Sequence, residues 1–390
     1  MKKTLAVFIA AVMLAAFIPA CGNNNAALTV WCAQDDKEMI TMMVNEFSAA
    51  NPSVKSVKVE VCEDDATRAK FEGNPQAAAD VICIPHDQLG ALVEGGALCE
   101  ITEKYIGAIG ENTALSIKAG QVGGRQYGFP SSFETQLLFY DKSILSNTEA
   151  VTLEGILSSG ALFAMDFGNA YFSANWFFTY GCKLFGDDGN DKTFCDFDSP
   201  DGVAAMSYLI DNREKFGNCA ADTAAGLFKE HKLGAYIGGP WNAAAMTEAL
   251  KGNYGCAMLP AVDGKPMKSF AGFKLYCVNA NTKNKAAAME LASWLTNPAN
   301  QKTRFLTRNL IPVAVSLADD IDVAVSATAK AVMAQGAYAI AMPSIPEIGN
   351  FWEPTGKLTL SCYQGDLGIS ELQDELTRLA SAIKGLSPAL

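Results

Sequence analysis

Residues 28–62 read LTVWCAQDDKEMITMMVNEFSAANPSVKSVKVEVC, and this stretch alternates between two kinds of hydrophobic pattern. Leu28–Cys32 and Val57–Cys62 are short apolar runs of the kind that form buried strands. Between them, Asp36–Phe47 places apolar residues at helical spacing, and Asn51-Pro52 ends that helix. The stretch therefore predicts a strand, a helix and a second strand.

The same alternation continues along the chain. A helix is predicted near Asp65–Phe71, and a buried strand is predicted at Val81–Ile84. Successive strand–helix–strand units build a parallel sheet with helices on its faces, so the fold class is α/β. Ligands of such sheets bind where loops leave the carboxyl ends of the strands.

The rest of the chain has a different character until a late return to strand-like sequence. The middle third opens with Gln136–Tyr140, is rich in aromatic residues, and contains the predicted helix Pro200–Asn212 and the strand-turn Ala235–Trp241. Gly272–Val278 resembles the early strands, and the tail from about Asp322 is predicted to be mostly helical. A chain of this length predicts two lobes rather than one core.

The N-terminus has the features of an export signal. Lys2 and Lys3 precede the apolar run Leu5–Ile18, and Ile18-Pro19-Ala20-Cys21 resembles the bacterial signal for lipid attachment to a cysteine. We predict a lipoprotein-type signal peptide at 1–20, lipid attachment at Cys21 and a flexible tether at 21–27. An uncleaved N-terminal membrane anchor is the alternative, but the apolar run is short for a transmembrane helix.

Composition limits the choice of partners. The chain has 30 basic and 42 acidic residues and a net charge of −12. Such an acidic protein is not expected to bind nucleic acid or anionic lipid. The sequence contains no CxxC motif and no histidine-rich spacing that would predict a zinc site, and no cofactor is expected.

Cys182 and Cys195, which flank a turn-rich segment, are the best disulfide candidates, although connectivity does not follow from sequence.

Seven segments, in one order across the mature chain, resemble the maltose/maltodextrin-binding proteins, which belong to the family 1 extracellular solute-binding proteins of ABC importers. They are DVICIPHDQLG at 80–90, ALCEIT at 97–102, YGFPSSFE at 127–134, FYDK at 139–142, YF at 171–172, IGGPW at 237–241 and MPSIPEIGNFW at 342–352. Each match is short, but together they cover the region from about residue 28 to residue 385.

The resemblance implies a type II periplasmic-binding-protein fold, with two discontinuous α/β lobes joined by a hinge. It assigns residues 28–132 and 273–320 to the N-terminal lobe, and residues 135–270 and 322–385 to the C-terminal lobe. A ligand between the lobes would close them, because only the closed form contacts it from both sides. The implied function is to bind maltose, a maltodextrin or a related oligosaccharide outside the cell and deliver it to an ABC transporter.

Sugar hydroxyls need directed hydrogen-bond partners, and carboxylates are the strongest acceptors. Asp87 closely follows a predicted strand, and Glu134 lies in the segment that matches the family's crossing strand. Helix capping for Asp87 and a hinge ion pair for Glu134 are the alternative roles. Asp35 and Asp36 follow the first strand, where the resemblance places an Asp-Lys pair that binds one end of the sugar.

Flat aromatic side chains can stack on the apolar faces of pyranose rings. Tyr171, Trp241 and Trp352 are the candidates, and Met342 flanks the same platform or packs beneath it. Gly-Gly-Pro before Trp241 would end a strand and leave the indole free to project into the cleft. Packing in the core is the alternative role for each aromatic residue.

The chain also departs from the family pattern. Ile84 replaces a tryptophan and Asn169 replaces a glutamate, while Gln88 and Gly356 each replace an arginine; Glu353 replaces a tyrosine. One stacking surface and two cationic forks are therefore missing, which leaves the length and kind of sugar open.

Other functions fit the sequence less well than sugar binding does. Asp87 and Glu134 would also suit a glycosidase, but the chain has no G-x-S-x-G, P-loop, G-x-G-x-x-G or H-E-x-x-H motif, and no enzyme activity is expected. A peptide, polyamine or metal ligand explains the three aromatic residues less well. We expect a monomer outside the cytoplasm, anchored by its lipid to the membrane at the cell surface or in the periplasm, that contacts the transporter's membrane subunits.

Overall fold

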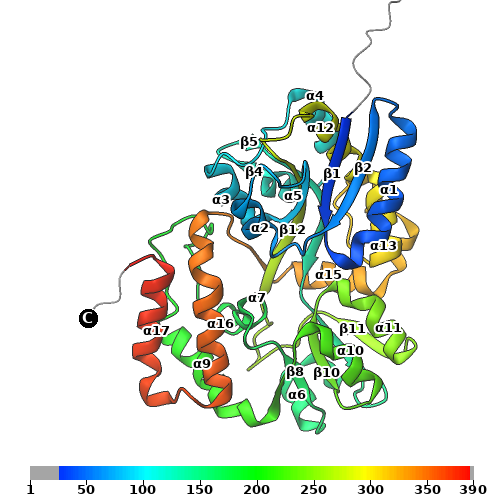
Figure 1. The fold of residues 1–390 in the computed structure, drawn as a ribbon. Coiled ribbons are helices and arrows are strands. Elements are labelled where there is room, and N and C mark those ends of the chain that lie inside the picture. Colours follow the sequence, from blue (N-terminus) through cyan, green and yellow to red (C-terminus); the bar gives the residue numbers. More distant parts are fainter. Residues whose placement is uncertain (1–25, 387–390) are drawn as a thin grey trace, which may run out of the picture.

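The computed structural model describes residues 26–386, which form two lobes that are each built around one β-sheet (Figure 1). The predicted signal peptide and the lipid site at Cys21 lie outside the described residues. Among residues 26–386, no helix combines the length and the apolar character that crossing a bilayer requires.

The first lobe contains a six-stranded sheet that begins with the predicted strand–helix–strand unit. β1 (Ala26–Cys32) pairs in parallel with β2 (Val54–Val61) and with β3 (Val81–Pro85). β12 (Ser269–Val278) joins antiparallel to β3, which gives the order β13-β12-β3-β1-β2 with β13 (Ala339–Ala341) at the edge. The sixth strand, β6 (Gly128–Thr135), lies off this path and pairs with β12. The return of the chain to the first sheet near residue 272, predicted from sequence, is confirmed.

The helix of that first unit, α1 (Lys37–Ala50), covers the sheet with the apolar face that the sequence predicts. Ile40, Met43, Val44 and Phe47 are all buried in the same core cluster as residues of β1. α1 also contacts α12 (Lys285–Leu295), so helices far apart in sequence share one face of the sheet.

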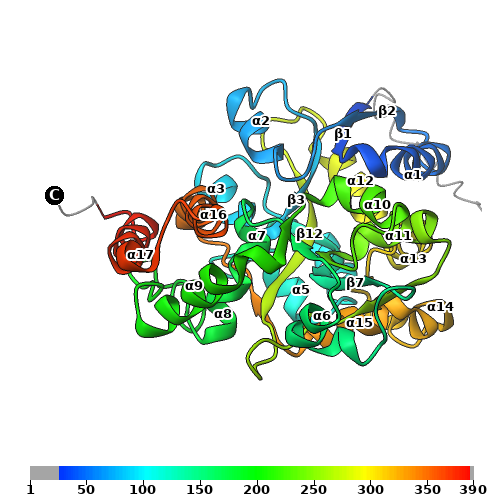
Figure 2. The ribbon, with the colours of Figure 1, turned by 90° about the horizontal axis from the view of Figure 1, so that it is seen from below.

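The second lobe contains a five-stranded sheet in the order β11-β7-β10-β8-β9. Its strands are β7 (Leu137–Asp141), β8 (Phe163–Met165), β9 (Phe216–Asn218), β10 (Ala235–Gly238) and β11 (Tyr254–Ala257). α9 begins at Pro200 and ends at Asn212, as predicted, and packs against α8 (Asn175–Tyr180). α16 (Gly349–Gln364) and α17 (Ile369–Ile383) form the outer flank of this lobe (Figures 1 and 2).

Two long paired strands connect the lobes. β6 (Gly128–Thr135) pairs antiparallel with β12 over residues 271–277, and only Gln136 separates β6 from β7 of the second sheet. Figure 2 shows β12 running through the middle of the molecule, with α7 (Ala170–Ser173) beside it. This pair of strands therefore lies where the chain passes from one lobe to the other.

The remaining elements are short or peripheral. A small hairpin pairs β4 (Gln121–Val122) with β5 (Arg125–Gln126). The other α-helices are α2 (Thr67–Gly73), α3 (Leu89–Glu94), α4 (Glu103–Ile109), α5 (Ala114–Ala119), α6 (Leu153–Ser158), α10 (Ala221–Lys229), α11 (Ala243–Leu250), α13 (Pro298–Arg308), α14 (Ile321–Val325) and α15 (Ala327–Gly336).

Two expectations from the sequence need correction. The tether predicted at 21–27 is too long, because Ala26 and Ala27 already belong to β1 and pair with Val54 and Ser56 of β2. The disulfide between Cys182 and Cys195 is not formed. Both side chains are buried free thiols, and burial raises the pKa of each to about 12, so each behaves as a small apolar side chain.

Candidate functional site

Asp87 lies just beyond the carboxyl end of β3, in the short 3-10 helix His86–Gln88. Its side chain does not cap a helix, and its Oδ1 accepts no hydrogen bond within the described residues. Burial raises the pKa of Asp87 to about 6, although the ammonium group of Lys274 acts in the opposite direction. A buried carboxylate oxygen without a partner is costly unless another group binds it, which favours a ligand role.

Glu134 lies on β6 directly opposite Gly272 of β12. Burial raises the pKa of Glu134 to about 7, opposed by Lys274 and reinforced by Asp64 and Asp36. Lys274 is two residues beyond Gly272 and therefore projects from the same face of the strand. Its Nζ lies 2.6 Å from Asp64 Oδ2 and 3.8 Å from Glu134 Oε2.

Sequence reasoning missed Lys274 and Asp64, which complete this charged group. The available signal was a lysine within the otherwise apolar strand Gly272–Val278, since lysine is rarely buried without a partner. Asp64 follows β2 and its side chain is largely buried, so both residues belong to the same sheet edge as Asp87.

The aromatic candidates come together in the second lobe. The ring of Tyr171 lies 6.3 Å from that of Trp241, measured between centroids, and 6.3 Å from Phe270. The ring of Trp352 lies 5.7 Å from Phe270. Phe270, which the sequence did not single out, is fully buried and joins the three predicted aromatic residues into one group.

Tyr171 links the aromatic group to the carboxylates. Burial raises its pKa, and the next contributions come from Glu134 and Lys274, so the three side chains are within electrostatic reach of one another. Gln136 Nε2 donates to the backbone oxygen of Tyr171 at 2.5 Å, and Asn175 in turn donates to Gln136 at 2.6 Å. The residue that joins β6 to β7 therefore positions Tyr171.

His86 connects the segments on either side of the site. The backbone N–H of Phe273 donates to Nδ1 at 3.2 Å, so Nε2 carries the hydrogen and donates to the carbonyl oxygen of Met342 at 3.0 Å. Burial lowers the pKa of His86 to about 4, which keeps this neutral tautomer. Met342 is itself buried, and its Cε lies near Gly272 on the face that carries Glu134.

Asp35 and Asp36 are held by an arginine rather than left open. Arg308 donates to Asp35 at 3.0 Å and to Asp36 at 2.9 Å. The side chain of Asp35 is 74 % exposed, whereas that of Asp36 is 16 % exposed. Burial raises the pKa of Asp36, and the neighbouring Asp64 raises it further, so Asp36 borders the charged group and Asp35 does not.

Gln88 replaces an arginine of the family pattern, and its side chain forms hydrogen bonds with the backbone of a neighbouring turn. Its amide nitrogen donates to the backbone oxygens of Asp64 and Asp65, and its oxygen accepts from the backbone N–H of Arg68, each at 3.1 Å. Gln88 therefore holds the turn that brings Asp64 to Lys274.

The other departures also have structural reasons. Ile84 is fully buried in the first lobe, where it offers no stacking surface. The side chain of Asn169 caps α7 by accepting from the N–H of Tyr171. A side chain at Gly356 would overlap the carbonyl oxygen of Gly168, and exposed Glu353 pairs with Lys357.

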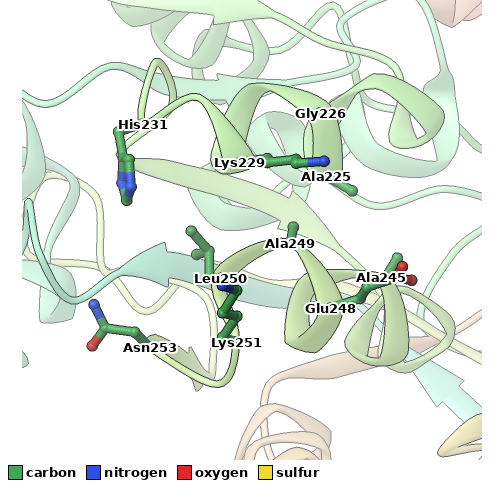
Figure 3. A pocket seen from close by; sticks show the side chains of 10 residues that line it. All are labelled: Ala225, Gly226, Lys229, His231, Ala245, Glu248, Ala249, Leu250, Lys251 and Asn253. Carbon is green, nitrogen blue, oxygen red and sulfur yellow. The ribbon is translucent and has the colours of Figure 1, made fainter.

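A cavity of about 850 Å³ lies elsewhere, between α10 and α11 of the second lobe (Figure 3). Its lining includes Lys229, Glu248 and Lys251, all exposed to solvent, together with several small residues. It holds none of the predicted site residues. This surface groove is therefore separate from the carboxylates and the aromatic group of the candidate site.

The chain is similar in sequence to known solute-binding proteins. The model of a family described as bacterial extracellular solute-binding protein matches residues 42–334. A galactooligosaccharide-binding protein of Bacillus subtilis is 29 % identical over 97 % of each chain, and the maltodextrin-binding protein MdxE of the same organism is 27 % identical over 89 % of this chain and 87 % of its own.

Solved structures resemble this fold over most of its length. The Thermus thermophilus maltotriose-binding protein, bound with maltotriose, superposes with a TM-score of 0.81 at 25 % identity, covering 92 % of this chain and 99 % of its own. The two-lobed type II fold expected from the sequence is thereby confirmed.

Proposed function

Because this chain belongs to the family of bacterial extracellular solute-binding proteins, we propose that it binds a neutral oligosaccharide between its two lobes and delivers it to an ABC importer. The observation that carries the proposal is the aromatic group of Tyr171, Trp241 and Trp352, in which Tyr171 lies within electrostatic range of the buried carboxylates Glu134 and Asp87. Aromatic rings suit the apolar faces of pyranoses, and the carboxylates suit their hydroxyls.

A maltodextrin is the first candidate ligand. The motifs at 80–90, 237–241 and 342–352 support it, as does the similarity to proteins that are named for maltodextrins or maltotriose. A galactooligosaccharide is the second candidate, because the relative that is 29 % identical along nearly the whole chain is named for that ligand. The missing aromatic surface at Ile84 is a reason to test both.

The ligand-binding residues that we propose are Asp36, Asp87, Glu134, Tyr171, Trp241, Met342 and Trp352, with Asp35 at the margin. We place the lobe boundaries where the sequence put them, near residues 132–135, 270–273 and 320–322. Lipid attachment at Cys21, a monomeric state and the absence of catalysis are further parts of the proposal.

Calorimetric titration of the mature protein tests this function. Maltose, maltotriose, a cyclodextrin, galactobiose and a galactotriose would each be titrated, with a tripeptide as the control ligand. We expect at least one oligosaccharide to bind and to be recovered uncleaved. Binding of the tripeptide alone, or of none of these ligands, would contradict the proposal, and a shortened sugar would reveal a glycosidase.

A further inference from the structure

Lys274 has an unusual position, with its ammonium group at the centre of the carboxylates of the site. We infer that Lys274 is a specificity-determining residue, which donates a hydrogen bond to one hydroxyl oxygen of the bound saccharide while Glu134 accepts the hydrogen of that same hydroxyl. This inference rests on the proposed function, because it names the contact by which the site would choose among oligosaccharides.

The distances allow one hydroxyl oxygen to lie within hydrogen-bonding distance of both Lys274 and Glu134. Lys274 Nζ lies 2.6 Å from Asp64 Oδ2, which uses one of the three ammonium hydrogens. Glu134 Oε2 lies 3.8 Å from Nζ, too far for a direct hydrogen bond. A hydroxyl that accepts from Nζ and donates to Glu134 would complete both groups, and such charge-assisted hydrogen bonds are the stronger kind.

The register of the strands explains why these side chains meet. In antiparallel pairs, residues directly opposite each other project to the same face. Ser132 lies opposite Lys274, and Glu134 lies opposite Gly272, so the four positions form one patch on the β6–β12 pair. Gly272 has no side chain, so only the Met342 methyl group and the Glu134 carbonyl oxygen come within 4 Å of the Cβ position between Glu134 and Lys274.

Three buried polar atoms around Lys274 have no hydrogen-bond partner among the described residues. They are Asp64 Oδ1, Asp87 Oδ1 and Ser132 Oγ. Asp87 is 7 % exposed and Ser132 is 1 % exposed. Buried polar atoms are almost always paired in folded proteins, so three unpaired oxygens from β6 and from the ends of β2 and β3 point to a polyhydroxylated ligand that binds beside Lys274.

The contacts of Gln88 support the inference that Lys274 is held in a fixed position at the site. By binding the backbone of Asp64 and Asp65, Gln88 fixes the carboxylate that holds the Lys274 ammonium group. Interactions with Asp64 and Glu134 raise the pKa of Lys274 despite its burial, so the cation persists at neutral pH. The site thus contains a positioned cation although positions 88 and 356 lack arginine.

The test combines variants of the protein with altered ligands. Affinities of the mature wild type and of Lys274→Met would be measured by calorimetry for maltotriose and a galactotriose, and then for the monodeoxy derivatives of whichever binds. Lys302→Met is the matched control, because Lys302 also pairs with two carboxylates, Asp320 and Asp322, but lies outside the site.

We expect Lys274→Met to bind the parent sugar about 10- to 100-fold more weakly, the range for a lost hydrogen bond to a charged group. Lys302→Met should bind within about twofold of the wild type, because Lys302 and its two carboxylate partners lie outside the site although its side chain is about as buried as that of Lys274. One monodeoxy sugar, which lacks the hydroxyl that contacts Lys274, should bind the wild type more weakly than the parent sugar does. Lys274→Met should bind that sugar with the same affinity as the wild type. Equal penalties for every monodeoxy sugar in both proteins would overturn the inference and leave Lys274 a structural role.

Two more variants keep the test decisive if Lys274→Met unfolds. Lys274→Met/Asp64→Asn removes the unpaired charge that the single change leaves, and it should lose the same hydroxyl preference. Lys274→Arg keeps the charge and should change the ranking of the sugars without lowering the melting temperature. An unchanged ranking in Lys274→Arg together with wild-type affinity in the double variant would overturn the inference. Failure of the wild type to bind any sugar would instead overturn the proposed function.

Discussion

The indole of Trp241 lies directly over the backbone of Gly239, so that a methyl group on Gly239 would overlap three carbons of its six-membered ring. Gly239 precedes Pro240 where β10 ends, and its backbone is in an ordinary extended conformation. The requirement for glycine here is therefore steric. We expect Gly239→Ala to displace the indole and weaken sugar binding roughly tenfold or more.

Calorimetry of Gly239→Ala beside Gly226→Ala checks this relationship. Gly226 lies in α10 with nothing within 4 Å of an added methyl group, so its replacement should leave the affinity unchanged. Equal affinities of the two variants would show that the position of the indole does not matter for the ligand.

Removing the indole altogether should have a larger effect. Trp241→Ala should weaken binding by about 2–4 kcal/mol, as the loss of a central aromatic anchor does. The same variant should lose most of the tryptophan fluorescence change that the sugar causes in the wild type. Trp294→Phe is the control, because that indole donates to Met43 in the first lobe and its ring contact is with Phe47. Unchanged affinity of Trp241→Ala would remove Trp241 from the site.

A close approach between α3 and the segment before α16 predicts a second glycine effect. A methyl group on Gly90 would overlap the carbonyl oxygen of Ser344. We expect Gly90→Ala to keep these segments apart, to lower the affinity for sugar about tenfold, and to enlarge the sugar-bound molecule in small-angle X-ray scattering. Gly107→Ala in α4, where an added methyl group meets nothing within 4 Å, should match the wild type in both measurements.

The raised pKa of Glu134 predicts how stability depends on pH. Its pKa is about 7 in the folded protein, against an ordinary value of 4.5. Between these pH values the folded state binds more protons at Glu134 than the unfolded state does. The stability that protonated Glu134 contributes is therefore fully present below about pH 4.5 and is lost as the pH rises towards 7. Glu134→Gln cannot ionise and should be more stable than the wild type by roughly 1–3 kcal/mol near pH 8.

Urea denaturation of Glu134→Gln at about pH 5 and about pH 8 measures this difference. The exposed Glu353→Gln is the control and should show the pH dependence of the wild type. Glu134→Gln should also bind sugar more weakly at the higher pH, because it has lost an ionised acceptor. A variant that loses stability at pH 8 would mean that Glu134 is mainly an ion-pair partner of Lys274.

The two aspartates that pair with Arg308 should differ in their effects. Asp36 is largely buried and close to Asp64, whereas Asp35 is mostly exposed. We therefore expect Asp36→Asn to lower the affinity for sugar severalfold, and Asp35→Asn to change affinity and stability by less than about 0.5–1 kcal/mol. Calorimetry and thermal unfolding of both variants provide the comparison. A larger loss of affinity in Asp35→Asn would place Asp35 at the ligand.

Much of the site follows from local pattern. Asp87 is predicted as a ligand-binding residue because it follows a buried strand, and Tyr171, Trp241 and Trp352 because they occur in recognisable motifs. Lys274, Asp64 and Phe270 were missed because their roles depend on partners more than 80 residues away in the sequence. No local pattern in the strand Ser269–Val278 reports that Lys274 faces Glu134 and Asp64.

The sequence by itself determined the strand–helix–strand start, the buried face of α1, the limits of α9 and the family of the chain, because each depends on periodicity or on contiguous motifs. Tertiary structure alone decided which departures from the family pattern matter. Among these departures, Gln88 supports the turn that contains Asp64, and Gly356 is a point of close packing. Tertiary structure also placed Lys274, the cation of the proposed site, beside Asp64. These outcomes depend on strand register and burial, which bring distant residues within a few ångströms and change the charge that each can carry.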